Sequence, residues 1–449
     1  MQLVDQAVRD YKELGRVSPN ASYTPPIDKS TMEVLERRVL RKTLERAYAN
    51  TTYYSRLAEE KGIKKVSDRN LSSLPLTTKS NLRGKENEFI DVESKDTAIL
   101  FSSTGTTGWP PSSVWMGRSE MEMIAASNAF FLVSKGYVLP GSLVQFAMVS
   151  RAGLTTWANI EACKRIGAPV VHTGVIDPEE CLRLLSTDYG LKGERNKVSI
   201  LFTYPSYLDL LVERGKSMGF GPKDFDLRTI VASGEVFTLG TRRRVADFFG
   251  AQILEIYNIS ECIQVAGTVC SQGNLHFTRE GRVEVLDPDT LEEVSEQECG
   301  VLTFTPYRPP REITLLVRYA TSDVVRRLEG CNCELALLPA FSKPLGKYDK
   351  GLATCGLTYR DLLELLENVE GVSHPLRVSL NQEKDESFVL HLSAENDDEV
   401  TARVEEAYRK KNLHPPKVVL HRTGESFAHY PIRCDLRELT FSSMKHDNR

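Results

Sequence analysis

The chain alternates short apolar runs with amphipathic stretches over most of its length. Between residues 75 and 345, apolar runs such as Val198 to Thr203 and Ile253 to Tyr257 are typical of buried strands. Stretches with a helical period follow them, for example Tyr207 to Arg214 and Arg242 to Phe249. Strands that alternate with helices in this way predict an α/β core in which helices cover a sheet.

The two ends of the chain have different patterns. Residues 31 to 63 are charged with a helical period, and residues 335 to 355 are rich in Gly, Lys and Pro, which predicts a linker. We therefore expect a large N-terminal α/β domain with several sheets over residues 1–345 and a small C-terminal α+β domain over residues 350–449. In the small domain the pattern predicts helices over Tyr359 to Leu366 and Glu399 to Lys411, a hairpin of Leu376 to Leu380 with Phe388 to Leu392, and a strand over Val418 to Leu420.

Composition narrows the classes of protein. A chain of 449 residues with a formal charge of −4 is expected to be globular and not to bind nucleic acid. No stretch of 18 apolar residues occurs, so no membrane span is expected, and residues 1–16 mix both charge signs, unlike a signal peptide. The nine cysteines have irregular spacing. This spacing does not predict a disulfide framework, and it favours a cytoplasmic protein.

A run of glycine and hydroxyl residues lies between the apolar runs Ala98 to Phe101 and Ser113 to Met116. Because glycine lets the backbone close around an anion, such a loop can offer N–H and hydroxyl groups to a phosphate. It lacks the Gly-x-x-x-x-Gly-Lys-Ser/Thr pattern of P-loop NTPases. The alternative is a solvated turn. The candidate phosphate ligands are Ser103, Thr104, Gly105, Thr106, Thr107 and Gly108.

A second candidate group lies where the apolar run Ile253 to Ile256 ends. It consists of Tyr257, Asn258, Ser260 and Glu261. Ligands in α/β folds collect outside the carboxyl ends of strands. There an aromatic ring can stack on a purine, and a carboxylate can bind Mg²⁺. The alternative is a buried ring beside a surface acid.

Two further groups follow apolar runs. Asp323 comes after Ile313 to Val317, and an ionised carboxylate can accept both hydroxyls of a ribose. Its alternative role is to cap a turn. Ser233, Gly234 and Glu235 follow the run Thr229 to Val231, where a glycine permits the close approach of a flat ring.

In this order the motifs resemble those of the adenylate-forming superfamily of acyl-CoA synthetases, adenylation domains and luciferase. Within it they resemble most the phenylacetate–CoA ligase and coenzyme F390 synthetase branch. Tyr53 to Leu57 and Leu74 to Arg83 are similar to the N-terminal signature of that branch, and Thr203 to Tyr207 follows in the expected order. The resemblance extends over about residues 40 to 437. It implies the fold of adenylate-forming enzymes, with a mobile C-terminal domain.

The resemblance implies an ATP-dependent acid–CoA ligase that acts on a small carboxylic acid, for which it favours an aromatic one. The carboxylate attacks the α-phosphate of ATP with Mg²⁺ present, which gives acyl-AMP and pyrophosphate. The thiol of coenzyme A then displaces AMP. Alternative acceptors are an amine, a hydroxyl or the thiol of an acyl carrier protein, and a homodimer is considered as the assembly.

The resemblance also implies roles for single residues. Asp323 is expected to bind the ribose, Glu261 to bind Mg²⁺ as part of the catalytic site, and Asp349 to be the hinge between the domains. The hydroxyl residues of the glycine-rich run are expected to bind the β- and γ-phosphates, and Gly234, Glu235 and Tyr257 to flank adenine. The other candidate nucleotide ligands are Gly105, Gly108, Ser233, Asn258 and Ser260.

The main departure from the family pattern lies near the C-terminus. Relatives carry a lysine there that bridges the carboxylate and the α-phosphate, whereas this chain places His429 at that position, and Arg433 is the nearest permanent cation. A histidine is mostly neutral near pH 7. His429 is therefore either catalytic or an ordinary surface histidine. Besides a CoA ligase and a ligase with another acceptor, the third possible function is that of a degenerate family member, which binds nucleotide without forming the adenylate. Relatives also carry Gly where Ser322 stands.

Two more sets of residues follow from the resemblance. Some members of the branch bind a structural metal through residues that match Cys270, His276, Cys331 and Cys333, and three thiolates with one imidazole suit Zn²⁺. The alternative is a pair of unrelated buried thiols and a surface histidine. The acyl pocket is expected near Phe146, Leu154 and Trp157, which are equally expected in the core.

Overall fold

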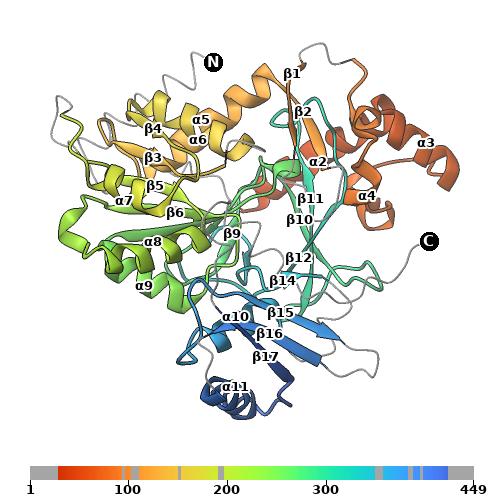
Figure 1. The fold of residues 1–449 in the computed structure, drawn as a ribbon. Coiled ribbons are helices and arrows are strands. Elements are labelled where there is room, and N and C mark those ends of the chain that lie inside the picture. The colour runs from red at the N-terminus through yellow and green to blue at the C-terminus, as the bar shows by residue number, and fades with distance from the viewer. Residues whose placement is uncertain are drawn as a thin grey trace.

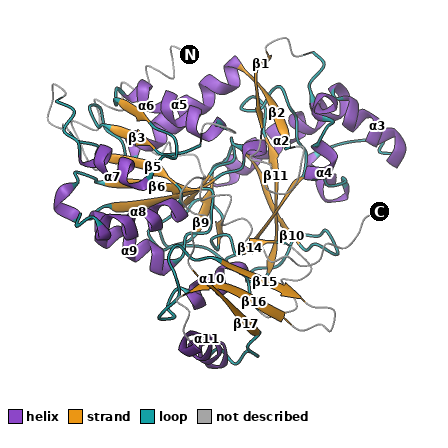
Figure 2. Cartoon of the chain, in the orientation of Figure 1, coloured by secondary structure: helices purple, strands orange, loops and turns teal. Residues whose placement is uncertain are grey.

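The computed structural model describes residues 29–93, 97–102, 111–149, 153–190, 197–348, 357–382, 388–394 and 398–422. Within these residues the strands form four sheets in a mixed α/β arrangement (Figures 1 and 2). The fold class that the sequence predicts is therefore confirmed.

The largest sheet has eight strands in the order β13-β9-β8-β7-β6-β5-β3-β4. The three central strands of its parallel part are short runs of buried residues, as expected for strands that are covered on both faces, and the two outer parallel strands are partly buried. The remaining strands are antiparallel. The parallel strands are β3 (Val144–Phe146), β4 (Val170–His172), β5 (Ile200–Thr203), β6 (Thr229–Ser233) and β7 (Gln252–Tyr257), and the antiparallel ones are β8 (Gly267–Val269), β9 (Leu275–Phe277) and β13 (Ala340–Phe341).

Helices lie along both sides of this sheet (Figure 1). Helices α5 (Arg118–Ser134) and α6 (Leu154–Ile166) pack together on one side. On the other side lie α7 (Pro178–Ser186), α8 (Pro205–Ser217), the turn η3 (Pro222–Asp224) and α9 (Leu239–Phe249).

The N-terminal helices and two further sheets enclose a second core. Residues 31 to 63 form two helices rather than one, because Thr51 ends the first and accepts a hydrogen bond from the backbone N–H of Tyr54 in the second. The elements are α2 (Lys29–Asn50), α3 (Thr52–Lys61), η1 (Asp68–Ser73), α4 (Lys79–Leu82), η2 (Glu86–Phe89), the hairpin of β1 (Thr97–Ser102) and β2 (Ser113–Gly117), η4 (Ser260–Cys262), and the sheet of β10 (Gly281–Leu286), β11 (Cys299–Pro306), β12 (Tyr319–Arg326) and β14 (Gly346–Lys347).

The C-terminal part has a hydrophobic core of its own, which includes Leu366, Leu390 and Val404. Val236 of the N-terminal part packs against this core. The elements of the C-terminal part agree with the predicted pattern of a helix, a hairpin, a helix and a strand. They are α10 (Tyr359–Leu366), β15 (Val378–Gln382), β16 (Phe388–Ala394), α11 (Asp398–Lys410) and β17 (Lys417–Arg422).

Two local expectations need correction. The apolar run Ile313 to Val317 is not a strand; it is buried as irregular chain in the second core, and β12 begins only at Tyr319. The predicted linker is also partly structured, because β13 pairs with β9 and β14 pairs with β12. Hydrogen bonds to these neighbouring strands, which lie far away in the sequence, order a segment whose composition indicates a loop.

Across the described residues, no helix is both long enough and apolar enough to cross a membrane.

Candidate functional site

A cavity of about 590 Å³ lies beside the carboxyl ends of β6 and β7, between the large sheet, β12 and α10. The predicted candidates from three separate segments line it together. They are Ser233, Gly234 and Glu235 at the end of β6, Tyr257, Asn258, Ser260 and Glu261 at the end of β7, and Asp323 of β12. Ser233 and Asp323 are 90 positions apart in the sequence, so the fold alone brings these groups together.

Asp323 and Tyr257 form the first polar pair of the cavity. The Tyr257 hydroxyl donates a hydrogen bond of 2.6 Å to Oδ2 of Asp323, and Lys347 Nζ lies 2.8 Å from Oδ1. Burial, and then the Asp323 charge, raises the pKa of Tyr257 well above its usual value. Tyr257 is thus held as a neutral donor, and the Asp323 carboxylate is fixed from both sides.

Asp323 lies in the middle of β12. The apolar run Ile313 to Val317 before it suggests instead that Asp323 follows a strand. The residue before it, Ser322, has a φ of 69°, in the left-handed region that favours glycine. The left-handed conformation explains why the family pattern expects glycine at this position, and Ser322 adopts it at some cost.

Glu261 and Lys79 form the second polar pair. Glu261 is only 6% exposed, and it accepts a hydrogen bond of 2.5 Å from the Ser112 hydroxyl. Lys79 Nζ, at the start of α4, lies 3.6 Å from Oε1 of Glu261. Burial lowers the pKa of Lys79, and the Glu261 charge opposes this shift.

The sequence motifs do not single out Lys79 as a site residue. The available signal was its place in the segment Leu74 to Arg83, which resembles the N-terminal signature of the ligase branch. That segment is distant in sequence from every other residue of the cavity. Hydrophobic pattern alone cannot show that α4 lies beside η4.

Glu235 and Gly234 shape the end of the cavity near α8. Oε2 of Glu235 accepts a hydrogen bond of 3.0 Å from the backbone N–H of Ser206, in the first turn of α8. Gly234 has a φ of 86°, which a residue with a side chain rarely adopts. Asn258 is held from α6, because its Oδ1 accepts a hydrogen bond of 3.0 Å from the Thr155 hydroxyl.

Several predicted residues lie outside the described residues. These are Ser103, Thr104, Gly105, Thr106, Thr107 and Gly108, the hinge Asp349, and His429 with Arg433. The described residues that flank residues 103–110 are placed by the β1–β2 hairpin, in which the hydroxyls of Ser102 and Ser113 lie 2.8 Å apart. Ser112, next to this pair, reaches Glu261.

The residues expected at the acyl pocket do not line this cavity. Phe146 is fully buried and stacks on Phe202, with ring centroids 4.5 Å apart, and Leu154 is fully buried in the second core. Trp157 faces a shallow groove between α5 and α6. Phe146 and Leu154 are therefore core residues, and Met148, Val149 and Tyr204 occupy the neighbouring wall of the cavity.

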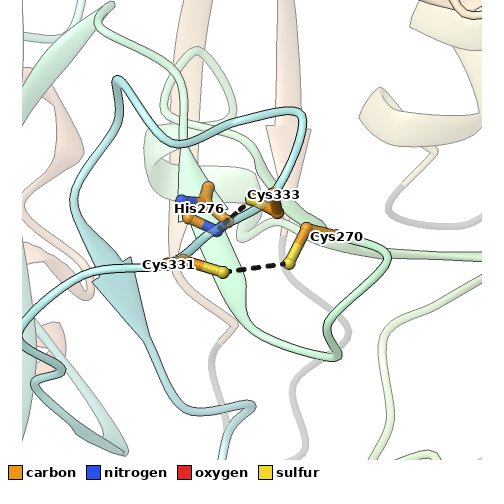
Figure 3. A group of neighbouring side chains, drawn as sticks. All are labelled: Cys270, His276, Cys331 and Cys333. Atoms are coloured by element: carbon orange, nitrogen blue, oxygen red, sulfur yellow. Dashed lines mark hydrogen bonds between the residues drawn. The ribbon is translucent and has the colours of Figure 1, made fainter.

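The cysteine and histidine candidates meet at one point. The ligand atoms of Cys270, His276, Cys331 and Cys333 all lie within 4.8 Å of one another (Figure 3). The sulfurs of Cys270 and Cys331 are 3.7 Å apart, and Sγ of Cys333 is 3.4 Å from Nε2 of His276. Nδ1 of His276 lies 3.3 Å from the Leu338 carbonyl, which can only accept, so the proton is on Nδ1 and Nε2 is free to bind.

Comparison with known proteins finds no family model that matches the chain. The chain is 27% identical over 326 residues to the phenylacetate–coenzyme A ligase of Thermus thermophilus. The matched region covers 69% of this chain and 70% of the relative. It is 27% identical over 316 residues to the enzyme of the same name from Escherichia coli, covering 67% and 68% of the two chains.

Among solved structures, the chain matches 2-hydroxyisobutyryl-CoA ligase in its postadenylation state with a TM-score of 0.72 and 18% identity, over 91% of this chain and 92% of the other. The thioesterification state of that ligase gives a TM-score of 0.62, with 91% and 92% covered. These likenesses place the chain in the superfamily of adenylate-forming enzymes. Within that superfamily, the chain is similar in sequence to phenylacetate–coenzyme A ligases.

Proposed function

We propose that this chain is an ATP-dependent acid–CoA ligase that forms AMP and acts on a small carboxylic acid. The observation that carries the proposal is that three of the four predicted nucleotide-binding segments converge on one cavity of about 590 Å³. A cavity of that volume is large enough for a ligand the size of an acyl-adenylate. The similarity to phenylacetate–coenzyme A ligases supports an aromatic acid.

In this proposal the nucleotide lies along the carboxyl ends of β6 and β7. Asp323 accepts the ribose hydroxyls, and the Tyr257 hydroxyl and Lys347 ammonium orient its carboxylate. Adenine lies between Gly234 and Tyr257, because the glycine leaves room for a flat ring and the aromatic residue offers a face to stack on.

The polyphosphate and the reacting carboxylate lie beside Glu261 and Lys79. The buried carboxylate of Glu261, with the hydroxyl of Ser112, is the oxygen donor set that would hold Mg²⁺. When bound, Mg²⁺ neutralises charge on the phosphate oxygens. The Lys79 ammonium reaches the same part of the cavity, and we assign to it the cationic role that His429 cannot fill when neutral.

We propose that the chain divides into domains 1–345 and 350–449 with a hinge near Asp349. The separate hydrophobic core of the C-terminal part supports this division. A rotation at the hinge between the two half-reactions would let one cavity serve both steps.

We also propose that Cys270, His276, Cys331 and Cys333 bind a structural Zn²⁺. A tetrahedral centre with Zn–S bonds of about 2.3 Å places its sulfurs about 3.8 Å apart, and the sulfurs of Cys270 and Cys331 lie 3.7 Å apart. The ion would tie the β8–β9 hairpin to the chain between β12 and β13. Four protein ligands leave no open position, so its role is structural.

The proposed activity is tested by ATP–pyrophosphate exchange with a panel of phenylacetate, benzoate and 2-hydroxyisobutyrate. We expect exchange with at least one acid, and release of AMP that requires coenzyme A. Turnover without coenzyme A, when an amine or a carrier protein is supplied, would instead point to another acceptor. Absence of exchange with every acid would contradict acid activation and favour a degenerate, nucleotide-binding member.

Replacing Tyr257 with phenylalanine is expected to weaken AMP binding about two- to tenfold. The change removes one hydrogen bond to Asp323, worth about 0.5–1.5 kcal/mol, and keeps the ring that faces adenine. Equilibrium titration with AMP measures the effect. Tyr137→Phe, at a tyrosine that does not line the cavity, is the control and should bind AMP like the wild type. Equal affinities of the Tyr257 variant and the wild type would contradict the assigned ribose site.

A further inference from the structure

Glu367 joins the C-terminal part of the chain to the start of a helix in the N-terminal part. It follows α10 directly, and its side chain is buried, with the residue 7% exposed. Its carboxylate accepts hydrogen bonds of 2.9 Å and 3.0 Å from the backbone N–H groups of Gly240 and Thr241, and of 2.5 Å from the Thr238 hydroxyl. Thr238 is the N-cap of α9. A carboxylate is favoured there, because the first N–H groups of a helix lack partners within it.

The large domain leaves space for this carboxylate at Gly240. A Cβ atom at position 240 would lie 2.6 Å from Cδ and Oε2 of Glu367. Any side chain there would push the carboxylate away from the start of α9. Both parts of the chain therefore shape this contact: the N-terminal part provides a glycine on α9, and the C-terminal part provides the glutamate after α10.

Two more contacts join the same two parts of the chain. Arg360 of α10 donates hydrogen bonds of 2.9 Å and 2.8 Å to the carbonyls of Phe237 and Pro344. His374 Nδ1 lies 3.4 Å from Oδ2 of Asp209 on α8. All the partners precede residues 349–356, and Arg360, Glu367 and His374 follow them.

These contacts set one wall of the proposed catalytic cavity. Leu363, Pro375 and Leu376 of the C-terminal part line the cavity together with Ser233 to Glu261 of the large domain. Leu363 lies on α10, one turn before Glu367. A rotation of the C-terminal domain would remove this wall and break the contacts of Glu367 at the same time.

We propose that Glu367 is a positioning residue that holds the C-terminal domain against α9 during adenylation and releases α9 when the domain rotates for thioester formation. This inference rests on the proposed function. The higher TM-score with the postadenylation state than with the thioesterification state of 2-hydroxyisobutyryl-CoA ligase agrees with it. The contact stabilises one domain orientation, so its loss slows one half-reaction and spares the other.

The test separates the two half-reactions in Glu367→Gln. Glutamine keeps the size of the side chain but removes the charge and turns an NH₂ donor toward N–H and O–H donors. We expect ATP–pyrophosphate exchange with phenylacetate to fall about tenfold. The rate of thioester formation from synthetic phenylacetyl-adenylate and coenzyme A should stay unchanged or rise. Glu370→Gln, at an exposed glutamate three residues further on, is the matched control. Equal losses in both half-reactions of Glu367→Gln would overturn the proposal.

A second measurement does not depend on activity. Hydrogen–deuterium exchange at the amides of Gly240 and Thr241 is expected to be about tenfold faster in Glu367→Gln than in the wild type, because both amides donate to the carboxylate. Gly240→Ala, which displaces the carboxylate from the other side, should show the same split between half-reactions. If the wild type activates no acid, the proposed function fails, but the amide exchange still tests the contact. Unchanged exchange at both amides would refute the role of Glu367.

Discussion

Replacing Lys79 with methionine is expected to slow acyl-adenylate formation about a hundredfold to a thousandfold, the range seen when one electrostatic contact to a transition state is removed. Lys79 Nζ lies 3.6 Å from the buried carboxylate of Glu261 and lines the cavity. Methionine keeps most of the apolar stem and removes the charge. This chain has His429 where the family pattern expects a lysine, so no second lysine at that position compensates for the loss.

Single-turnover formation of acyl-AMP from ATP and the preferred acid measures the effect of Lys79→Met. Lys85→Met removes the same charge at an exposed position six residues further along the chain, and should leave the rate unchanged. Lys79→Arg, which keeps a cation, should retain more activity than the methionine variant. A wild-type rate in Lys79→Met would show that another cation acts on the phosphate.

The second large effect is expected from replacing Cys331 and Cys333 together with serine. Purified wild-type protein should contain about one zinc per chain, and the double variant should contain none. Binding of an ion to the folded state alone contributes about 4 kcal/mol of stability when free metal exceeds Kd about a thousandfold. Thermal unfolding of the double variant should therefore occur several degrees lower than that of the wild type.

Cys299→Ser is the matched control for the metal centre. Cys299 is an exposed free thiol that does not belong to the cluster, so its replacement should change neither the zinc content nor the unfolding temperature. Removal of metal from the wild type with a chelator should reproduce the lower unfolding temperature of the double variant. A wild-type protein without zinc, with a double variant of equal stability, would show that the cluster is a set of ordinary buried thiols.

Much of the cavity could be predicted because it is built at the ends of parallel strands. The alternation of apolar runs and helices locates β6 and β7, and the residues that follow such strands face the ligand side of an α/β sheet. Gly234 and Asn258, which directly follow β6 and β7, are examples. The motif order then identifies the superfamily, although no single motif is specific.

The remaining parts of the site depend on contacts between distant segments. The apolar run Ile313 to Val317 suggests that Asp323 follows a strand, because an apolar run that packs as irregular chain has the same composition as a strand. The same ambiguity affects Phe146, since an aromatic residue near a pocket and one in the core look alike in sequence. Lys79 begins the short helix α4 and Glu367 directly follows α10, and only the packing of these helices shows what the two side chains face.

Calorimetric titration of the full-length chain with AMP and with Mg²⁺–ATP tests most directly whether the cavity beside β6 and β7 binds an adenosine nucleotide. We predict saturable binding of both nucleotides to the wild type, and binding weakened at least tenfold by Asp323→Ala, which removes the acceptor for the ribose hydroxyls. Asp289→Ala, at an exposed aspartate outside the cavity, should bind like the wild type. Absence of binding of both nucleotides to the wild type would contradict the account.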